Sequence, residues 1–409
     1  MTLSLFQGFG VELEYMVVAE GSLDVSPIVD ELFLKYAGSY VSDIERGPLS
    51  WSNELVAHVV ELKTTLPVGT LDGVAAAFQR DVQEINRLLA GSDARLLPTG
   101  MHPWMDPRRE TRLWPHDNDV VYKAFDRIFG CSGHGWSNLQ SAHLNLPFDG
   151  DAEFGKLHAA IRLILPLIPA LSASTPFIDG ARGTALDQRL AVYRANSKRI
   201  PSVCGRVIPE PVYTRATYER ELLGRIYADI APFDPEGILQ DEFLNARGAI
   251  ARFGRGSIEI RIIDTQECPA ADLAIIALVV TTLEDLVAER WTTGREQASW
   301  STERLADLYD RVVTEGDFAV IDDPKYLEAF GLSVDKATAS EVWHAILEQV
   351  VSAPRLQQHL PSLAILTKGG PLARRILRRT GQNPTHEKLH EVYSELSQCL
   401  SQGRMLSAS

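Results

Sequence analysis

The chain has 409 residues, enough to bury a sizeable core in one large domain or in two ordinary ones. With 45% apolar residues, 23% charged residues and a mean hydropathy of −0.07, its composition is typical of a globular protein. Forty basic residues against 54 acidic ones leave a net charge of −14, which argues against a nucleic acid or an anionic membrane surface as the main partner.

Apolar runs and cysteines give no sign of a membrane or secretory segment. The longest apolar run, residues 161–173, is interrupted by Arg162, Pro166 and Pro169, so it is not a membrane-spanning helix. A strand pattern begins within about ten residues of Met1, and we therefore expect no signal peptide. The cysteines are scattered, without CxxC or metal spacing, at positions 131, 204, 268 and 399. A reducing cytoplasm is the expected location.

Strands and helices alternate in the first third of the chain. We predict strands over residues 8–18, 53–66 and 95–99, and a helix over 70–89 with Asp72 near its start and Gly91 after its end. A loop, residues 100–104, follows the third strand. Asp117 or Asn118 is expected to cap a helix that runs to Phe129, and residues 137–148 form the next predicted strand.

Helices dominate the rest of the chain. We predict helices over residues 151–172, up to Arg199 and over 214–231, then two strands within 248–264 joined by a hairpin at Gly254-Arg255-Gly256, and helices from Ala271 onward. Strands scattered among helices favour an α+β fold with an antiparallel sheet over a βαβ array. We expect one catalytic domain over 1–409, with a sheet-bearing core (1–268) and a helical C-terminal portion (269–409).

Two glutamates share one face of the first predicted strand. Residues i and i+2 of a strand point the same way, so Glu12 and Glu14 lie side by side, with Val11, Leu13 and Tyr15 opposite. Two like charges repel unless a cation lies between them. A solvated strand face is the alternative explanation.

The second strand region carries two further carboxylates, Glu54 and Glu61. Glu61 stands among apolar neighbours, so its charge needs a partner. Lys63, two residues on and on the same face, can supply it, and a purely structural ion pair is therefore an alternative to a metal site.

Two later strands repeat this pattern. His143 and Asn145 share a face, with Ala142, Leu144 and Leu146 opposite, and Glu259 and Arg261 share a face opposite three isoleucines. A structural histidine and a simple Glu259–Arg261 pair are the alternatives here.

Together these strands suggest a metal site. If one sheet carries all of them, its concave face holds five carboxylates and one imidazole, a donor set that favours Mg²⁺ or Mn²⁺ over zinc. Mg²⁺ held by carboxylates commonly has phosphate as its other ligand. Arg261 and Arg194 could then neutralise phosphate or a substrate carboxylate.

Two C-terminal motifs offer other chemistry. His386-Glu387-Lys388-Leu389-His390 fits the HExxH zinc string, but no third ligand follows Glu395. Arg374-Arg375 and Arg378-Arg379 form a basic helix, either a solvated face or a segment that closes over nucleotide. No Walker A string occurs, and neither GxSxG nor GxGxxG occurs in the required strand–turn–helix context.

The chain resembles the glutamate–cysteine ligase family, in the branch of bacterial carboxylate–amine ligases with a glutamine-synthetase-like fold. The similar segments follow in order from residue 10 to residue 261. They are Gly10-Val11-Glu12-Leu13-Glu14, Val60-Glu61-Leu62-Lys63-Thr64, Gly100-Met101-His102-Pro103, Ser141-Ala142-His143-Leu144-Asn145, Leu171-Ser172-Ala173-Ser174-Thr175-Pro176-Phe177, Tyr193-Arg194 and Arg252-Phe253-Gly254-Arg255-Gly256-Ser257-Ile258-Glu259-Ile260-Arg261.

The resemblance implies an antiparallel sheet curved into a half-barrel and covered by helices, with ATP and two or three Mg²⁺ ions on its concave face. It implies the metal ligands Glu12, Glu14, Glu54, Glu61, His143 and Glu259, and it implies that Arg194 and Arg261 hold phosphoryl oxygens or an amino-acid carboxylate. Asn145 stands where many relatives have a second histidine, and we expect it beside the cofactor. His134, in the loop 130–136, is a spare candidate near the site.

The expected function is that of an ATP- and Mg²⁺-dependent ligase, which phosphorylates the γ-carboxyl of glutamate and then joins it to an amine such as cysteine, as in glutathione biosynthesis. Alternatives are a γ-glutamyl ligase for a different amine, a guanidine-directed phosphotransferase and a catalytically silent ATP-binding homologue. We expect small-molecule substrates, no nucleic acid, no membrane and a homo-oligomer as one option for the assembly.

Overall fold

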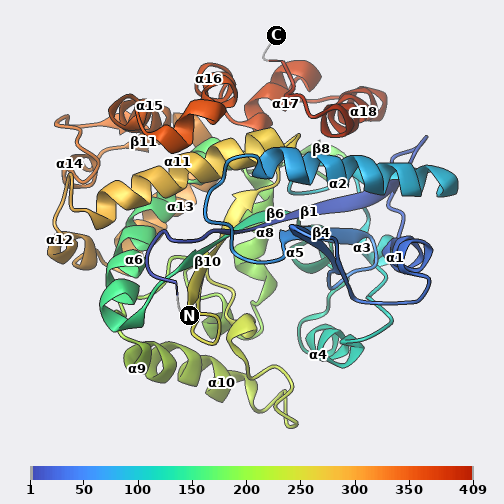
Figure 1. Ribbon diagram of the computed structural model, residues 1–409, viewed down its shortest axis with the longest axis horizontal. Helices are drawn as coiled ribbons and strands as arrows, with labels where there is room; N and C mark the ends of the chain where they lie inside the picture. Colours follow the sequence, from blue (N-terminus) through green and yellow to red (C-terminus); the bar gives the residue numbers. More distant parts are fainter. Residues whose placement is uncertain (1–2, 408–409) are drawn as a thin grey trace.

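An open antiparallel sheet runs through the middle of the molecule (Figure 1). The computed structural model describes residues 3–407, and among these residues eight strands join in the order β2-β3-β4-β1-β6-β10-β9, while β5 pairs with the end of β1. The strands are β1 (Gly10–Ala19), β2 (Asp43–Glu45), β3 (Leu49–Asn53), β4 (Val59–Thr64), β5 (Ala94–Leu97), β6 (Ser141–Pro147), β9 (Ala249–Arg252) and β10 (Ser257–Asp264). The predicted α+β fold with an antiparallel sheet is confirmed.

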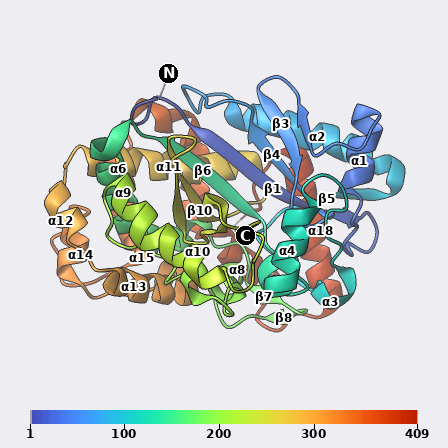
Figure 2. The ribbon, with the colours of Figure 1, turned by 90° about the horizontal axis from the view of Figure 1, so that it is seen from below.

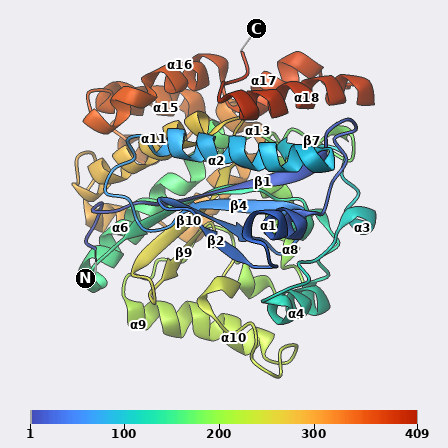
Figure 3. The same cartoon turned by 45° about the vertical axis from the view of Figure 1, so that its right-hand side comes forward.

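One face of this sheet is apolar and carries the core. Val11, Leu13 and Tyr15 of β1 are fully buried on it, together with Leu144 of β6 and Ile258 of β10. Figures 1 and 3 show α2 and α11 lying across this side of the sheet, and the C-terminal helices lying beyond them. The long helix α11 is apolar almost all round because it is covered on both sides.

The helices have the following bounds: α1 (Val29–Ala37), α2 (Val74–Leu89), α3 (Pro107–Glu110), α4 (Asp119–Phe129), α5 (His134–Ser137), α6 (Gly150–Ile164), α7 (Pro169–Ser172), α8 (Gln188–Asn196), α9 (Arg215–Thr217), α10 (Gly224–Ile230), α11 (Pro269–Val287), α12 (Gly294–Ala298), α13 (Thr302–Glu315), α14 (Pro324–Glu328), α15 (Ala339–Val350), α16 (Leu360–Gly369), α17 (Leu372–Thr380) and α18 (His386–Gln402). Two short strand pairs, β7–β8 (Phe177–Ile178 and Ala181–Arg182) and β11–β12 (Val320–Ile321 and Ala337–Thr338), stand apart from the sheet.

The other face of the sheet is polar. In the view from below, α9 and α10 lie on one side of it and α4 lies on the other (Figure 2). The register of the strands decides which side chains meet on this face, because directly opposite residues of neighbouring strands point the same way.

Several predicted boundaries are wrong, each for a local reason. The predicted strand 53–66 is two strands, since β3 ends at Asn53 and β4 begins at Val59, and the loop between them pairs through Val56 with Leu113. The strand predicted from residue 137 begins only at Ser141, because the preceding residues form α5. The helix predicted after Asp117 or Asn118 is confirmed, since Asn118 (φ 72°) precedes α4 as its N-cap, without a side-chain hydrogen bond, and α4 ends at Phe129.

The helical regions agree more closely with the predictions made from the sequence. The predicted helix 151–172 is broken between α6 and α7, where Pro166 and Pro169 remove backbone donors. The C-terminal third is helical apart from β11 and β12. Among the described residues, no helix combines the length and apolarity that crossing a bilayer requires. The division at residue 268 stays a prediction.

Candidate functional site

The strand register gathers the predicted acidic residues on the polar face. Glu12 lies directly opposite His143 on β6 and opposite Lys63 on β4. Glu14 lies opposite Glu61. On the far side of β6, Asn145 lies opposite Glu259. Four strands therefore place their charged side chains next to one another.

His143 connects the two halves of this cluster. Its Nδ1 lies 2.8 Å from a carboxylate oxygen of Glu12, and its Nε2 lies 2.9 Å from the hydroxyl of Ser141. Ser141 in turn donates its backbone N–H and its hydroxyl to Glu14, at 2.6 and 3.1 Å. Asn145 donates to the second oxygen of Glu12 at 3.0 Å. The imidazole is thus oriented by carboxylate and hydroxyl partners on both nitrogens.

Two groups of side chains are close enough to share a cation each. One ligand atom from each member of Glu12, His143 and Glu259 lies within 4.8 Å of the others, and the same holds for Glu14, Glu61 and His143. Carboxylate oxygens with one imidazole are a donor set that suits Mg²⁺ or Mn²⁺. The residues present therefore fit a divalent ion.

Cationic side chains also reach the cluster. Lys63 lies 3.1 Å from Glu61, and Arg252 and Arg261 lie 3.1 and 2.9 Å from Glu259. Both ion pairs that the sequence offered as alternatives are therefore formed. Glu14 has no such lysine or arginine partner within the described residues, and its only close cation is His143, at 3.8 Å.

Burial and crowding shift the pKa values of the cluster in opposite directions. Burial raises the pKa of Glu61 to about 7, and the charge of Glu12 adds to this while Lys63 and Ser52 oppose it. Burial raises the pKa of Glu54 as well, helped by Glu14 and Glu61. These shifts mark the crowding of negative charge that a bound cation relieves.

The pair of Glu12 and His143 behaves differently. Burial disfavours the charged form of each, yet their mutual hydrogen bond and attraction hold the pKa of Glu12 at about 2 and raise that of His143 to about 9. With both nitrogens next to acceptor oxygens, the imidazole is a donor on each side when the ion is absent.

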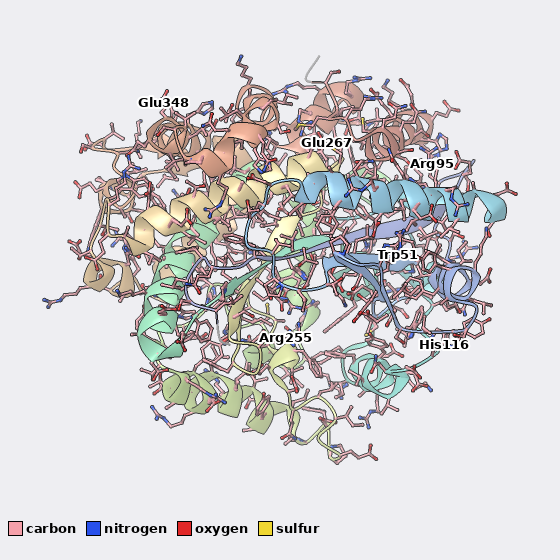
Figure 4. All side chains as sticks on the ribbon, in the orientation of Figure 1. Trp51, Arg95, His116, Arg255, Glu267 and Glu348 are labelled. Atoms are coloured by element: carbon pink, nitrogen blue, oxygen red, sulfur yellow. The ribbon has the colours of Figure 1, made fainter. Side chains whose placement is uncertain are left out.

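The cluster lines a cleft of about 810 Å³. Glu54 reaches this cleft from the loop after β3, and Arg255 reaches it from the hairpin between β9 and β10. Figure 4 shows Arg255 below the sheet, on the side opposite α2 and α11. The cleft is therefore bordered by both carboxylates and guanidinium groups.

Arg194 does not lie in the cleft. Its side chain is 48% exposed and pairs with Asp310 of α13 at 2.7 Å. The residues of α8 that point toward the site are Arg189, Tyr193 and Asn196, at helical spacing i, i+4 and i+7. Arg194 follows Tyr193 by one residue and so faces about 100° away from it.

The residues that sequence reasoning missed are Arg189, Tyr193, Ser141, Arg252 and Arg255. Arg252 and Arg255 flank the glycine hairpin that the sequence identified, so basic residues beside that turn were an available signal. Ser141 stands two residues before His143, on the same strand face. Arg189 and Tyr193 share one helical stripe.

The zinc-type string in α18 serves packing. His386 and His390 lie against Trp104, with ring centroids 4.8 and 6.3 Å apart, and His390 contacts the carbonyl of Gly21 at 2.9 Å. Within residues 3–407, neither histidine belongs to a group that could hold a metal ion.

The basic helix and the spare histidine lie elsewhere too. Arg374 pairs with Asp317 at 2.7 Å, and Arg375 pairs with the buried carboxylate of Glu267. In Figure 1, α17 lies beyond α2 and α11, on the apolar side of the sheet, and no residue of α17 lines the cleft. His134 bonds Asp179 at 3.0 Å and does not line the cleft.

Comparison with known proteins identifies the family of the chain. The profile of glutamate-cysteine ligase family 2 (GCS2) matches residues 8–395. An uncharacterized protein of Archaeoglobus fulgidus is 31% identical over 341 residues, which cover 81% of this chain and 91% of that protein. A Rubrobacter xylanophilus protein provisionally named glutamate–cysteine ligase 2-3 is 27% identical over 186 residues, covering 46% of this chain and 47% of its own.

One solved structure shares the fold. Glutamate–cysteine ligase from Francisella tularensis, determined in complex with AMP, superposes with a TM-score of 0.60 at 12% sequence identity. The superposition covers 98% of this chain and 90% of that protein.

Proposed function

The chain belongs to glutamate-cysteine ligase family 2, and from this premise we propose that it is an ATP-dependent ligase that joins a carboxylate to an amine. The observation that carries the proposal is the cluster of carboxylates around His143, set in a cleft that also holds arginines. The AMP bound by the Francisella ligase of the same fold supports a nucleotide as one substrate.

The cluster would hold magnesium. Glu12, His143 and Glu259 form one candidate ligand group, Glu14 and Glu61 with the same histidine form the other, and Glu54 borders both. When bound, Mg²⁺ would neutralise phosphate charge and thereby favour phosphoryl transfer. Asn145 and Ser141 orient Glu12 and Glu14, and this keeps the ligand oxygens facing the cleft.

The cationic side chains would bind phosphate. Lys63, Arg252 and Arg255 line the cleft beside the acidic residues, where they can pair with phosphate oxygens. Arg261 lies at the wall of the cleft and can neutralise a phosphoryl or carboxylate oxygen during transfer.

We propose the γ-carboxyl of glutamate as the first acceptor of the phosphoryl group. Its oxygen attacks the terminal phosphorus of ATP, and ADP leaves. The amine nitrogen then attacks the acyl carbon, phosphate leaves, and the amine loses a proton to solvent. The products are an amide, ADP and phosphate. We propose the cytoplasm as the place of this reaction and γ-glutamyl compounds as its products.

The test is nucleotide turnover with purified protein, ATP, Mg²⁺, glutamate and a panel of amines that includes cysteine. We expect ADP release that requires Mg²⁺, glutamate and an amine together, and an amide product by mass spectrometry. Arg261→Ala should lower kcat by about 100-fold or more. The matched control Arg194→Ala, on the exposed face of α8, should stay within about twofold of wild type. Absence of turnover with every carboxylate and amine would refute the proposal.

A further inference from the structure

A second cavity opens off the first. Its volume is about 610 Å³, and it shares Glu14, Glu54, His143, Arg255 and Arg261 with the acidic cleft. The two spaces therefore meet at the metal-binding cluster. A molecule in the second cavity can present an atom to the reacting centre at this shared wall.

Five aromatic rings line the second cavity, beside aliphatic residues and the polar residues Asn118, Ser141, Arg189 and Asn196. The rings are Tyr122 and Phe125 of α4, Trp136 of α5, Tyr193 of α8 and Phe243 of the short turn Glu242–Leu244. All five are only partly buried, although rings of this size are usually placed in the core. Four separate elements therefore present accessible ring surface to the second cavity.

Two of the three polar ring atoms are already hydrogen-bonded to the protein, while the hydroxyl of Tyr193 has no hydrogen-bond partner among the described residues. Asn53 donates to the hydroxyl of Tyr122 at 2.9 Å, and the indole N–H of Trp136 donates to the carbonyl of Asn196 at 3.1 Å. Phe125 packs against Trp136 and Phe243, with ring centroids 5.3 and 6.1 Å apart. The ring surfaces left for a ligand are therefore faces and edges, which recognise apolar and aromatic groups, together with the hydroxyl of Tyr193.

The two cavities share Arg255 and Arg261 but differ in their other lysine and arginine residues. Lys63 and Arg252 line only the acidic cleft, where they lie near the candidate metal ligands, so a polyphosphate is better matched to that cleft. Arg189, which lines only the second cavity, is already paired with Asp264 at 3.1 Å. The second cavity is thus the better place for a substrate with an apolar group.

We propose that the second cavity binds the acceptor amine, and that this amine carries an aromatic or comparably bulky apolar substituent. The inference rests on the proposed ligase function and names the class of its acceptor. The amine nitrogen lies toward the wall shared with the acidic cleft, and the substituent lies among Phe125, Trp136 and Tyr193. A cysteine side chain would leave most of the 610 Å³ unfilled.

Matched amine pairs test the acceptor class. With ATP, Mg²⁺ and glutamate, we expect kcat/KM for phenethylamine to exceed that for ethylamine by at least about tenfold, and phenylalanine to exceed alanine and cysteine similarly. Equal or better turnover of ethylamine or cysteine would overturn the inference and leave the ligase function standing.

Substitutions in the second cavity test whether the acceptor amine binds there. Phe125→Ala should lower kcat/KM for phenethylamine by about tenfold and leave the KM for ATP unchanged. Phe125→Leu should restore part of the lost kcat/KM. Val120→Ala is the control, since this residue lies on the same helix, is 58% exposed and does not line the cavity. A raised KM for ATP with acceptor kinetics unchanged would assign the cavity to the nucleotide instead.

If no amine is turned over, a direct binding measurement tests whether the second cavity binds an aromatic amine. The absence of turnover would refute the ligase function, but ligand-observed NMR with phenethylamine still reports on the cavity. We expect binding to the wild type that Phe125→Ala weakens, with a folded spectrum in both proteins. No binding, or equal binding by both, would overturn the inference.

Discussion

Buried histidines outside the site are held neutral because burial disfavours their charged form. His102 donates from Nε2 to the carbonyl of Leu23 at 2.7 Å, and its Nδ1 accepts the backbone N–H of Trp104 at 3.3 Å. A proton on Nδ1 would remove that acceptor. Burial lowers the pKa of His102 to about 4, and it does the same for His58, which contacts the carbonyl of Ser137.

The protein should therefore lose stability in mild acid. An unfolded histidine binds a proton below pH 6.5 while the folded one does not, so the free energy of unfolding falls as the pH drops from 6.5 to about 4. The loss approaches about 3 kcal/mol for a fully shifted histidine. Urea unfolding across this range should show a shallower pH dependence for His102→Gln. An unchanged slope in the variant would contradict the assignment.

At the level of residues, alternation along strands predicted much of the site. Glu12, Glu14, Glu61, His143 and Glu259 each stand at a position whose strand neighbours are apolar, and the structure brings all five together. A helix gives no comparable guide, because an error of one residue turns a side chain by about 100°. This explains why Tyr193 reaches the second cavity and its neighbour does not.

At the level of elements, the site depends on how closely β1 and β6 approach each other. Gly10 lies opposite Asn145, and a Cβ at position 10 would stand 2.9 Å from the Cβ of that asparagine. The lack of a side chain at Gly10 therefore lets Asn145 reach Glu12. The same close approach brings Glu12 opposite His143, two residues along each strand.

Gly10→Ala should destabilise the sheet and disturb the cluster. We expect a loss of about 1–3 kcal/mol in the free energy of unfolding, because the added methyl group forces the strands apart. Gly21→Ala is the control, since a Cβ there meets nothing within 4 Å. Equal stabilities for the two variants in urea unfolding would show that the strand approach is not tight.

Element types were easier to predict than element boundaries. The amphipathic pattern of α2 and the glycine hairpin after β9 both identify real elements. The apolar loop between β3 and β4 resembles a strand in sequence because its side chains are buried by tertiary contacts, and local sequence does not reveal these contacts. The family resemblance implies that one antiparallel sheet carries these strands, whereas no local pattern predicts the pairing order that creates the cluster.

At the level of the whole molecule, a buried ion pair joins the sheet to the C-terminal helices. Glu267, three residues after β10, pairs with Arg375 of α17, and both side chains are fully buried. Each also bonds the backbone of Leu406, at 3.2 and 3.0 Å. Figure 4 shows Glu267 at the end of α11, beneath the C-terminal helices. The strand that carries Glu259 is thus connected to the end of the chain.

Removing one partner of this pair should be costly. Arg375→Met leaves the Glu267 carboxylate buried and unpaired, and we expect a loss of about 3–5 kcal/mol in the free energy of unfolding. Arg375→Met with Glu267→Leu should recover part of that loss. Lys388→Met, which breaks the exposed pair with Glu391, should cost at most about 1 kcal/mol. A small effect of Arg375→Met would mean that the C-terminal helices are held mainly by apolar packing.

The central claim is that the polar face of the sheet binds divalent cations through its carboxylates, and titration with Mn²⁺ followed by electron paramagnetic resonance tests it most directly. We expect the wild type to bind Mn²⁺, and Glu61→Gln to weaken binding by at least about tenfold, because even indirect changes around a metal site cost about 10–100-fold. Glu387→Gln, in the zinc-type string of α18, should bind as the wild type does. Absence of Mn²⁺ binding by the wild type, or unchanged binding by Glu61→Gln, would contradict the account.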